Sequence, residues 1–307
     1  MKRDFLTIND LNRSEVLSIF DETAKLKAER NSERAETPLS RRTVGMLFDK
    51  PSTRTRVSFE AGIYELGGSV VFLHRSETQF SRNEPISHSA RVLSSYVDAL
   101  VIRTFDQAEL EEMAQYASIP IINALTDMYH PCQVLSDMFT VWEKKERISD
   151  LKMAWIGDGN NMAHSWINAA ALMGFELALA VPEGYEPRTE ILEPARIRAE
   201  KPIALTRSPE EAVNGAEVIN TDVWASMGQE AEAEIRAEIF QDYQVNAELL
   251  ARAAPGAIVM HCLPAHLGEE ITDEVLEGPQ SVVFEQAENK LHAQKALLKF
   301  LILGQSE

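Results

Sequence analysis

Cysteine is scarce in this chain of 307 residues, which contains only Cys132 and Cys262. Two cysteines are too few for a disulfide framework, and no C-x-x-C spacing indicates a zinc or redox motif. No stretch approaches the roughly 20 apolar residues that a membrane-spanning helix needs. Asp4, Asp10 and Glu15 interrupt any apolar run that could serve as a signal peptide. We therefore expect a soluble cytoplasmic protein with no membrane partner.

Basic residues are also in deficit, because 30 Lys and Arg stand against 48 Asp and Glu, a formal net charge of −18. Such a charge repels nucleic acid at long range, so we expect no nucleic-acid partner. It also repels anionic small molecules. Any phosphate site must therefore be a local concentration of Arg side chains and backbone N–H groups.

The chain length and the pattern of apolar runs predict the architecture. A chain of 307 residues favours two domains of ~150 residues each. Apolar runs at 43–49, 69–73, 99–104, 119–124, 151–157, 176–182, 203–206, 216–223 and 257–263 predict strands. Helical spacing predicts helices at 11–31, 56–66, 85–97, 107–117, 131–146, 162–174, 187–199, 209–214 and 230–252. This alternation predicts an α/β fold of two domains, each with a mostly parallel sheet flanked by helices and joined by interdomain helices, with the boundary between residues 131 and 150.

Ligands of open α/β sheets bind at the carboxyl ends of the strands, and polar residues follow several of the predicted strands. The segment PSTRTR at residues 51–56 lies between a strand and a helix, where first-turn N–H groups and the helix dipole favour an anion. With its two arginines it predicts a phosphate cradle without P-loop glycines. The alternative is a Ser/Thr helix cap beside two solvated arginines.

Two further signals in the first half are weaker when taken alone. Arg103 ends the apolar strand LVIRT, so it must reach a carboxylate, a phosphate or water, and a salt bridge at the sheet edge would look the same. HPCQ at residues 130–133 offers a neutral His that could donate to a carbonyl oxygen and a Gln that could bind an amide. A lone His is more often a capping or core residue.

In the second half, GDGNN at residues 157–161 has the position of a dinucleotide-binding loop. Met162 occupies the third glycine position and no acidic residue ends the next strand, which disfavours a dehydrogenase. Asn160 and Asn161 are better interpreted as amides for a polar substrate, although turn formation remains open for one of them.

DVWASMGQE at residues 222–230 places Asp222 after a strand, where it could bind an ammonium group or simply cap a turn. HCLPAH at residues 261–266 places Cys262 at the end of an apolar strand, where a small buried hydrophobe is the alternative. Neighbouring side chains on a strand face opposite ways, so we expect His261 and Cys262 not to pair.

Together these motifs resemble the aspartate and ornithine carbamoyltransferase family across essentially the whole chain. FDKPSTRTRVSFE resembles the carbamoyl-phosphate signature, and HPCQ resembles the carbamoyl-binding motif. DVWASMGQE and HCLP resemble the ornithine-specific members, and SMG at residues 226–228 favours ornithine over N-acetylornithine or putrescine. The resemblance implies direct attack of the side-chain amine of L-ornithine on carbamoyl phosphate, giving L-citrulline and phosphate. It also implies that no cofactor or metal is needed and that the chain forms a homotrimer or a multiple of trimers.

The resemblance also implies roles for individual residues. Residues 1–135 would form the carbamoyl-phosphate-binding domain, with a C-terminal helix at about 287–305 packed back on it, and residues 150–286 the ornithine-binding domain. Carbamoyl phosphate would be bound by Ser52, Thr53, Arg54, Thr55, Gln79, Arg103, His130, Gln133, Cys262, Leu263 and Lys290, with Gln79 contributed by a neighbouring subunit. Ornithine would be bound by Asn161, Asp222, Ser226 and Met227. The catalytic residues would be Arg103, His130, Asp222 and Cys262.

The chain departs from the family pattern at Lys290, where the family usually has Arg. An ammonium is a point charge and cannot reproduce the bidentate fork of a guanidinium, so carbamoyl phosphate affinity is the property in question. A regulatory paralogue that binds carbamoyl phosphate without turnover is the alternative from another class. The presence of Arg103, His130, Asp222 and Cys262 argues against it.

Overall fold

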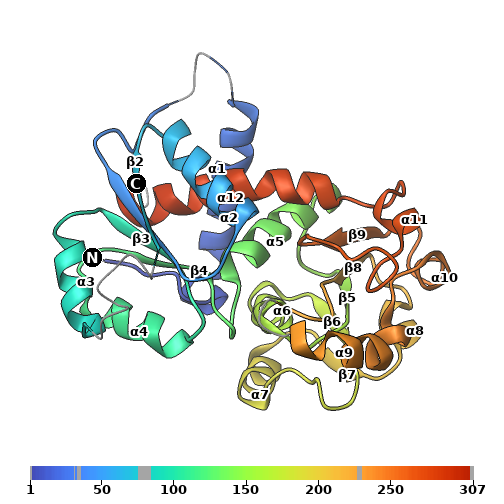
Figure 1. Cartoon of the computed structure of the whole chain (residues 1–307). Coiled ribbons are helices and arrows are strands. Elements are labelled where there is room, and N and C mark those ends of the chain that lie inside the picture. Colours follow the sequence, from blue (N-terminus) through green and yellow to red (C-terminus); the bar gives the residue numbers. More distant parts are fainter. Residues whose placement is uncertain (1, 31, 33–35, 75–83, 227–229, 305–307) are drawn as a thin grey trace. The chain divides into compact units, whose positions relative to one another are not determined.

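The computed structural model describes the chain except for residues 1, 31, 33–35, 75–83, 227–229 and 305–307. It divides into two compact units, one of Met1–Phe139 with Glu288–Glu307 and one of Thr140–Ala287. Each unit is built on one parallel sheet flanked by helices (Figure 1). The predicted α/β class with two parallel sheets is confirmed.

The first unit contains a four-stranded sheet in the order β2-β1-β3-β4. Its strands are β1 (Thr43–Phe48), β2 (Ser69–His74), β3 (Ala99–Arg103) and β4 (Ile121–Leu125). Its helices include α1 (Arg13–Ala28), α2 (Thr53–Glu65), α3 (Ile86–Ser94) and α4 (Gln107–Tyr116), after a short 3-10 turn η1 (Ile8–Asp10). The strand order reverses at β1, so the carboxyl ends of β1 and β3 flank the position where a ligand is expected.

The second unit contains a five-stranded sheet in the order β7-β6-β5-β8-β9. Its strands are β5 (Lys152–Ile156), β6 (Glu176–Ala180), β7 (Ile203–Thr206), β8 (Val218–Thr221) and β9 (Ile258–His261). Its helices include α6 (Asn161–Met173), α7 (Thr189–Arg198), α8 (Pro209–Val213), α9 (Ala233–Phe240), α10 (Ala247–Leu250) and α11 (Asp273–Leu276). Here the order reverses at β5, so the ends of β5 and β8 flank the expected ligand position.

Two helices carry the chain between the units. The helix α5 (Pro131–Lys145) begins in the first unit and ends in the second, whereas α12 (Val283–Leu303) begins in the second and ends in the first. The later part of α12 packs on α2, where a Cβ built on Gly62 would lie 3.0 Å from the side chain of Lys295. Lys295 also donates to Glu65 at 2.7 Å. The close approach of the two helices explains the glycine on α2.

The single long helix predicted at 230–252 is wrong. The segment forms η4 (Glu230–Glu232), α9, η5 (Gln241–Tyr243) and α10 instead. Helix formation stops because the backbone N–H of Val245 donates to the carbonyl of Glu270 at 2.8 Å, which makes the chain extended there. Asn246 then starts a new helix by accepting from the N–H of Leu249 at 3.0 Å.

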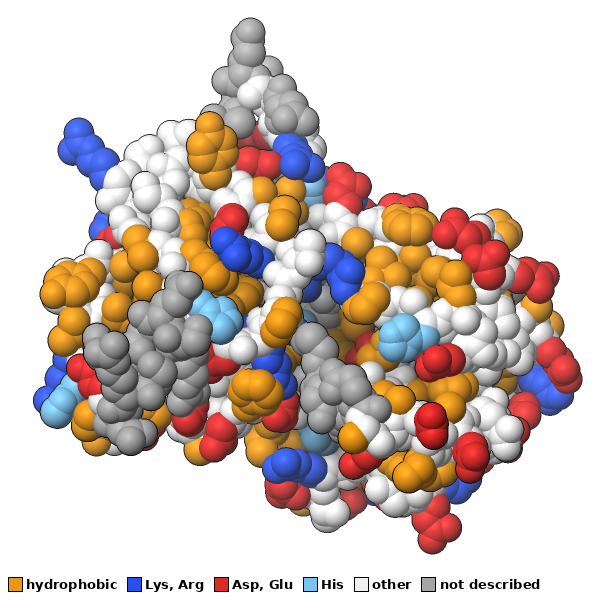
Figure 2. Space-filling view, in the orientation of Figure 1, with side chains coloured by type: hydrophobic (Ala, Val, Ile, Leu, Met, Phe, Trp, Pro, Cys, Tyr) orange, Lys and Arg blue, Asp and Glu red, His pale blue; other side chains and the backbone are white. Residues whose placement is uncertain are grey.

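Acidic side chains lie spread among polar and hydrophobic ones on the face of the molecule in Figure 2. The net charge of −18 is therefore distributed over much of the visible surface, and anion binding requires a local cluster of cations. Within the described part of the chain, no helix combines the length and the apolar character that crossing a membrane requires.

Candidate active site

The N-terminus of α2 in the first unit receives no capping hydrogen bond from the side chain of its N-cap residue, Ser52. Ser52 has extended backbone angles and its hydroxyl makes no capping hydrogen bond. The first-turn N–H groups therefore do not receive the partner that a Ser cap usually supplies. This geometry disagrees with the capping alternative and fits an anion site.

The two arginines of PSTRTR have different surroundings. Arg54 is exposed in the first turn of α2. Arg56 donates to Glu60 at 2.8 Å, and its guanidinium lies 3.6 Å from the centre of the Phe72 ring. Arg54 therefore stays the candidate for phosphate binding in this segment, whereas Arg56 pairs with Glu60 one turn further along the helix.

The buried ammonium group of Lys290 lies next to the first turn of α2. Lys290 on α12 donates to the hydroxyl of Thr55 and to Oε1 of Gln133, both at 2.8 Å. Gln133 in turn donates from Nε2 to Asp137 at 2.8 Å. Lys290 therefore ties the first turn of α2 to the first turn of α5.

His130, which precedes α5, and Arg103, at the end of β3, are also buried. Burial lowers the pKa of His130 well below its ordinary value, and the nearby charges of Lys290 and Arg103 lower it further. His130 is therefore neutral and can donate an N–H without carrying a charge. The structure brings Arg103, His130 and Lys290 into one electrostatic cluster, as their sequence positions alone could not show.

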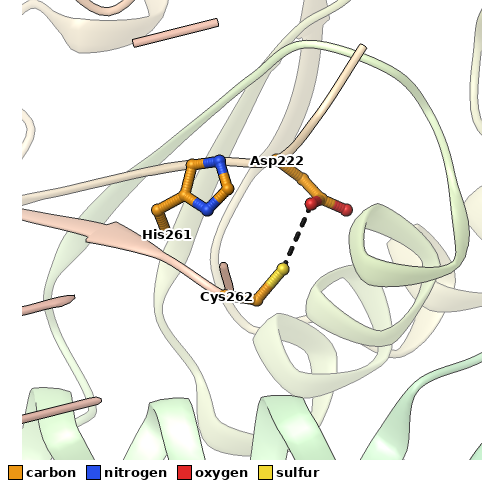
Figure 3. Close-up of side chains that lie close together, drawn as sticks. All are labelled: Asp222, His261 and Cys262. Atoms are coloured by element: carbon orange, nitrogen blue, oxygen red, sulfur yellow. Dashed lines mark hydrogen bonds between the residues drawn. The ribbon is translucent and has the colours of Figure 1, made fainter. Parts of the chain in front are cut away.

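Asp222 is the centre of the polar network in the second unit. Its Oδ1 accepts from the thiol of Cys262 at 3.1 Å, as Figure 3 shows. Its Oδ2 accepts from the side-chain amide of Asn160 at 2.9 Å. The network joins the residues that follow β8 and β9 to the start of α6.

The GDGNN loop has local structural reasons for its composition. Gly157 has φ +130°, and a Cβ built on Gly159 would lie 2.3 Å from the backbone nitrogen of Pro187. Asn160 caps α6 by accepting from the N–H groups of Met162 and Ala163. Asn160 is thus the residue with the turn-forming role, and Asn161 is the first residue of α6.

His261 and Cys262 lie closer together than expected. Nδ1 of His261 accepts from the N–H of Leu263 at 2.8 Å, so Nε2 carries the proton that is donated to Glu270 at 2.9 Å. Nitrogen, sulfur and oxygen atoms of His261, Cys262 and Asp222 nevertheless lie within 4.8 Å of one another (Figure 3). Strand alternation fails here because β9 ends at His261 and Leu263 has a left-handed φ of 57°.

These three side chains are the kinds of ligand that a zinc ion uses. A metal on His261 would have to break one of its two ring hydrogen bonds, so the arrangement does not favour a resident metal. A second cluster of His266, Glu269 and Glu270 has two exposed members. In this cluster Oε1 of Glu270 already accepts from the N–H of His266 and from His261.

The remaining candidates are distributed over both units. Ser226 and Leu263 are half-buried in the second unit, and Thr53 is exposed in the first. Gln79 and Met227 lie outside the described residues.

Sequence reasoning assigned no partner to Asp158 and missed Arg236 and Glu270. Asp158 forms a buried ion pair with Arg236 at 2.9 Å. Arg236 lies within a helix, where no local pattern separates it from a solvated surface arginine. Glu270 was missed because only the fold shows that its carboxylate is the hydrogen-bond partner of His261.

Two family models match consecutive parts of the chain. Residues 3–143 match the carbamoyl-P binding domain of aspartate/ornithine carbamoyltransferase, and residues 149–301 match its Asp/Orn binding domain. The chain belongs to the aspartate/ornithine carbamoyltransferase family.

Members of this carbamoyltransferase family match over nearly their full length. The chain is 57% identical over 293 residues to the ornithine carbamoyltransferase of Desulfotalea psychrophila, covering 95% of this chain and 97% of that protein. It is 54% identical over 302 residues to that of Syntrophus aciditrophicus, covering 98% and 100%. The solved ornithine carbamoyltransferase from Pyrococcus furiosus has a TM-score of 0.95 at 46% identity, covering 99% of this chain and 98% of that one.

Proposed function

We propose that this chain transfers the carbamoyl group of carbamoyl phosphate to the side-chain amine of L-ornithine, giving L-citrulline and phosphate. The observation that carries this proposal is the full-length identity of 57% to a protein named as an ornithine carbamoyltransferase. The anion site in the first unit and the Asp222 network in the second support it. The reaction belongs to arginine metabolism.

Carbamoyl phosphate is assigned mainly to the first unit. Its phosphate binds at the start of α2, where Ser52, Thr53, Arg54 and Thr55 surround N–H groups favourable to an anion. Arg103 bridges the phosphate and the carbamoyl oxygen, and His130 and Gln133 bind the carbamoyl group. The neutral state of His130 supports this role, because a neutral imidazole donates a hydrogen bond without adding charge to an already cationic cluster.

Ornithine is assigned to the second unit. Its amino-acid end binds Asn161, Asp222, Ser226 and Met227, while Cys262 and Leu263 lie beside the reacting amine. The hydrogen bond from Cys262 to Asp222 supports this arrangement, because it places the sulfur assigned to the reacting amine beside the carboxylate assigned to the amino-acid end. We assign no covalent step to Cys262, since its S–H donates a hydrogen bond to Asp222 and a neighbouring carboxylate does not favour the nucleophilic thiolate.

The chemistry follows from the charges that form and disappear. The side-chain amine of ornithine is protonated at neutral pH, like that of lysine, so it must lose a proton before it attacks. Attack on the carbamoyl carbon places negative charge on the carbamoyl oxygen, which Arg103, His130 and Thr55 stabilise. The bond between the carbamoyl carbon and the phosphate oxygen then breaks, and the phosphate leaves toward Arg54 and the start of α2. The attacking nitrogen gives up its second proton to the departing phosphate. Positioning of an already activated donor supplies much of the rate.

The proposed assembly is a homotrimer in which Gln79 of one subunit reaches the site of the next. Exposed apolar residues of the first unit support an interface. Val57 and Tyr64 lie seven residues apart on α2 and are 56% and 80% exposed, and Val71 on the edge strand β2 is 43% exposed. Such residues are typical of surfaces that a partner covers.

The test is citrulline formation from carbamoyl phosphate and L-ornithine by the purified protein. Putrescine, N-acetylornithine and aspartate, offered in parallel, separate the related activities. Production of citrulline at a rate well above that with any other amine supports the proposal. A clear preference for another amine would assign the chain to a different member of the family.

A further inference from the structure

A single buried arginine joins two loops of the second unit. Arg236 on α9 is 6% exposed. Its Nη1 donates to Oδ2 of Asp158 at 2.9 Å and to the backbone carbonyl of Trp224 at 2.8 Å. Asp158 is itself 7% exposed, so this ion pair lies inside the unit and not on its surface.

The two acceptors belong to loops that carry the proposed ornithine contacts. Asp158 lies in the loop 157–161, which follows β5 and includes Asn161, and Trp224 lies in the segment 222–226, which follows β8. β5 and β8 are hydrogen-bonded neighbours in the sheet. The Asn160–Asp222 hydrogen bond of 2.9 Å is a second link between the same two loops.

The guanidinium of Arg236 is held in place from several sides. It lies 4.8 Å from the centre of the Tyr185 ring and 6.0 Å from that of Phe240, and its Nε donates to Glu232 at 3.2 Å. The Trp224 ring stacks on Phe240 with a centroid distance of 6.1 Å. The guanidinium serves three acceptors from two of its nitrogens, with Nη1 donating to Asp158 and Trp224 and Nε donating to Glu232.

We propose that Arg236 is a positioning residue for ornithine. It fixes the loops 157–161 and 222–226 relative to each other, so that Asn161, Asp222 and Ser226 can bind the same ornithine molecule. The inference rests on the proposed function. Arg236 contacts no reacting atom, and it contributes to the affinity for ornithine and to the orientation of ornithine.

The ion pair is sensitive to pH in the acidic range. Burial raises the pKa of Asp158 to about 6, Arg236 opposes that rise, and the nearby Asp222 adds to it. The charged groups that face the pair are Asp222 and Glu232. As the pH falls through about 6, Asp158 is protonated and its bond to Arg236 loses its ionic character.

The first test separates the Michaelis constants of the two substrates. In Arg236→Gln we expect the KM for ornithine to rise about tenfold or more, with the KM for carbamoyl phosphate within about twofold of the parent value. Arg236→Lys keeps the charge but not the fork, so its ornithine KM should lie between the two. The matched control is Arg252→Gln, which removes an exposed arginine paired with Glu248 four residues earlier, as Arg236 is paired with Glu232.

A pH profile adds a readout that a general loss of stability would not produce. In the parent protein the KM for ornithine should rise as the pH falls through about 6. Protonation of the ornithine amine also raises this KM as the pH falls, equally in both proteins. In Asp158→Asn the KM should start higher and lose only the additional rise through about pH 6, because residue 158 no longer titrates. A variant with unchanged pH dependence would contradict the proposal.

Hydrogen exchange of the backbone amides in residues 222–226 tests, without relying on activity, whether Arg236 holds this segment in place. We expect faster exchange in Arg236→Gln than in Arg252→Gln.

Equal exchange in the two variants, or equal rises in the KM values for ornithine and carbamoyl phosphate in Arg236→Gln, would overturn the proposal even if citrulline is formed. If the parent protein itself makes no citrulline, faster exchange in Arg236→Gln would instead leave the proposed function overturned and, with it, the role in ornithine binding. If Arg236→Gln does not fold, Arg236→Lys and Asp158→Asn carry the same comparisons.

Discussion

At the scale of single residues, Lys290 stands where the family usually has an arginine, and its ammonium group makes two buried hydrogen bonds. Its two hydrogen bonds, to Thr55 and Gln133, run to two different elements, α2 and α5. An ammonium can make both, because it carries three N–H donors on one nitrogen. Lys290 therefore links the two elements in this chain with a donor of different shape from a guanidinium.

We predict that Lys290→Met raises the KM for carbamoyl phosphate about tenfold or more, because hydrogen bonds to a charged group contribute about 1.5–3 kcal/mol each. Lys290→Arg keeps the charge and should remain closer to the parent protein. Steady-state kinetics with varied carbamoyl phosphate measure both. The control is Lys299→Met on the same helix, where the lysine pairs with Glu22. An unchanged KM in Lys290→Met would remove Lys290 from the proposed site.

The two cysteines should differ sharply in reactivity. Burial raises the pKa of the Cys132 thiol to about 12, so almost no thiolate forms there at pH 8. Cys262 is only half-buried and lies beside the proposed amine site. We predict that iodoacetamide modifies Cys262 first and that ornithine slows this reaction, as peptide mass spectrometry would show. Modification of Cys132 in the folded protein at a similar rate would contradict the buried environment described here.

At the scale of elements, prediction from sequence succeeded where the pattern is local. β3 and β4 are buried along their whole length, and apart from Arg103 and Asn123 their residues are apolar, so each appears in the sequence as an almost continuous apolar run. The loop after β5 could be assigned because a strand, glycines and a helix follow in order. The interruption at Val245 could not be predicted, because it depends on pairing with Glu270 and Ile271, which lie more than twenty residues further along the chain.

The same distinction applies to the site. Positions after the strands were predictable because the carboxyl ends of parallel strands gather at one edge of a sheet. Their partners were not, because Lys290 reaches Thr55 across 235 positions and Arg236 reaches Asp158 across 78. Such long-range pairs leave no pattern in the local sequence. The contacts of Arg236 and of the buried Lys290 ammonium could therefore be identified only in the structure.

A buried histidine on α12 should make the stability of the protein depend on pH. Burial lowers the pKa of His292 to about 4, and the nearby cations Lys295, Arg30 and Lys27 add to this effect. Neither ring nitrogen has a hydrogen-bond partner among the described residues, and the carboxylate of Glu288 is 3.8 Å away. The unfolded chain protonates His292 near pH 6.5, whereas the folded chain does so only near pH 4.

The unfolding free energy should therefore fall as the pH decreases from about 6.5 to about 4, by an amount on the order of 3 kcal/mol from this residue. Urea titrations at several pH values measure the slope, which should be shallower in His292→Gln than in the parent. His88→Gln, at an exposed position on α3, is the control. Equal slopes in the two variants would show that His292 contributes nothing to the acid sensitivity.

At the scale of the whole molecule, the surface charge and the proposed reaction make opposite demands. A net charge of −18 attracts cationic ornithine and repels carbamoyl phosphate at long range. The structure meets the second demand locally, through the N-terminus of α2 and the cations Arg54, Arg103 and Lys290. A local cluster is effective because interactions between exposed charges are screened beyond about 8 Å at physiological salt.

The proposed assembly gives the last prediction, which concerns Tyr64. A tyrosine that is 80% exposed in the isolated chain costs nothing to replace there, but in an interface it would bury an aromatic ring. Tyr64→Glu would place a charge in that apolar surface, and a buried unpaired charge is strongly unfavourable. We predict that light scattering gives three times 34.4 kDa for the parent protein and a smaller mass for Tyr64→Glu, with citrulline formation lost together with assembly.

Tyr96, which is 72% exposed and not on α2 or β2, provides the matched control. Tyr96→Glu introduces the same charge at a similarly exposed tyrosine and should remain a trimer with parental activity. Loss of activity in Tyr64→Glu without dissociation would show local damage rather than an interface. A fully active Tyr64→Glu monomer would show that one chain carries a complete site, and the assignment of Gln79 to a neighbouring subunit would then lose its physical basis.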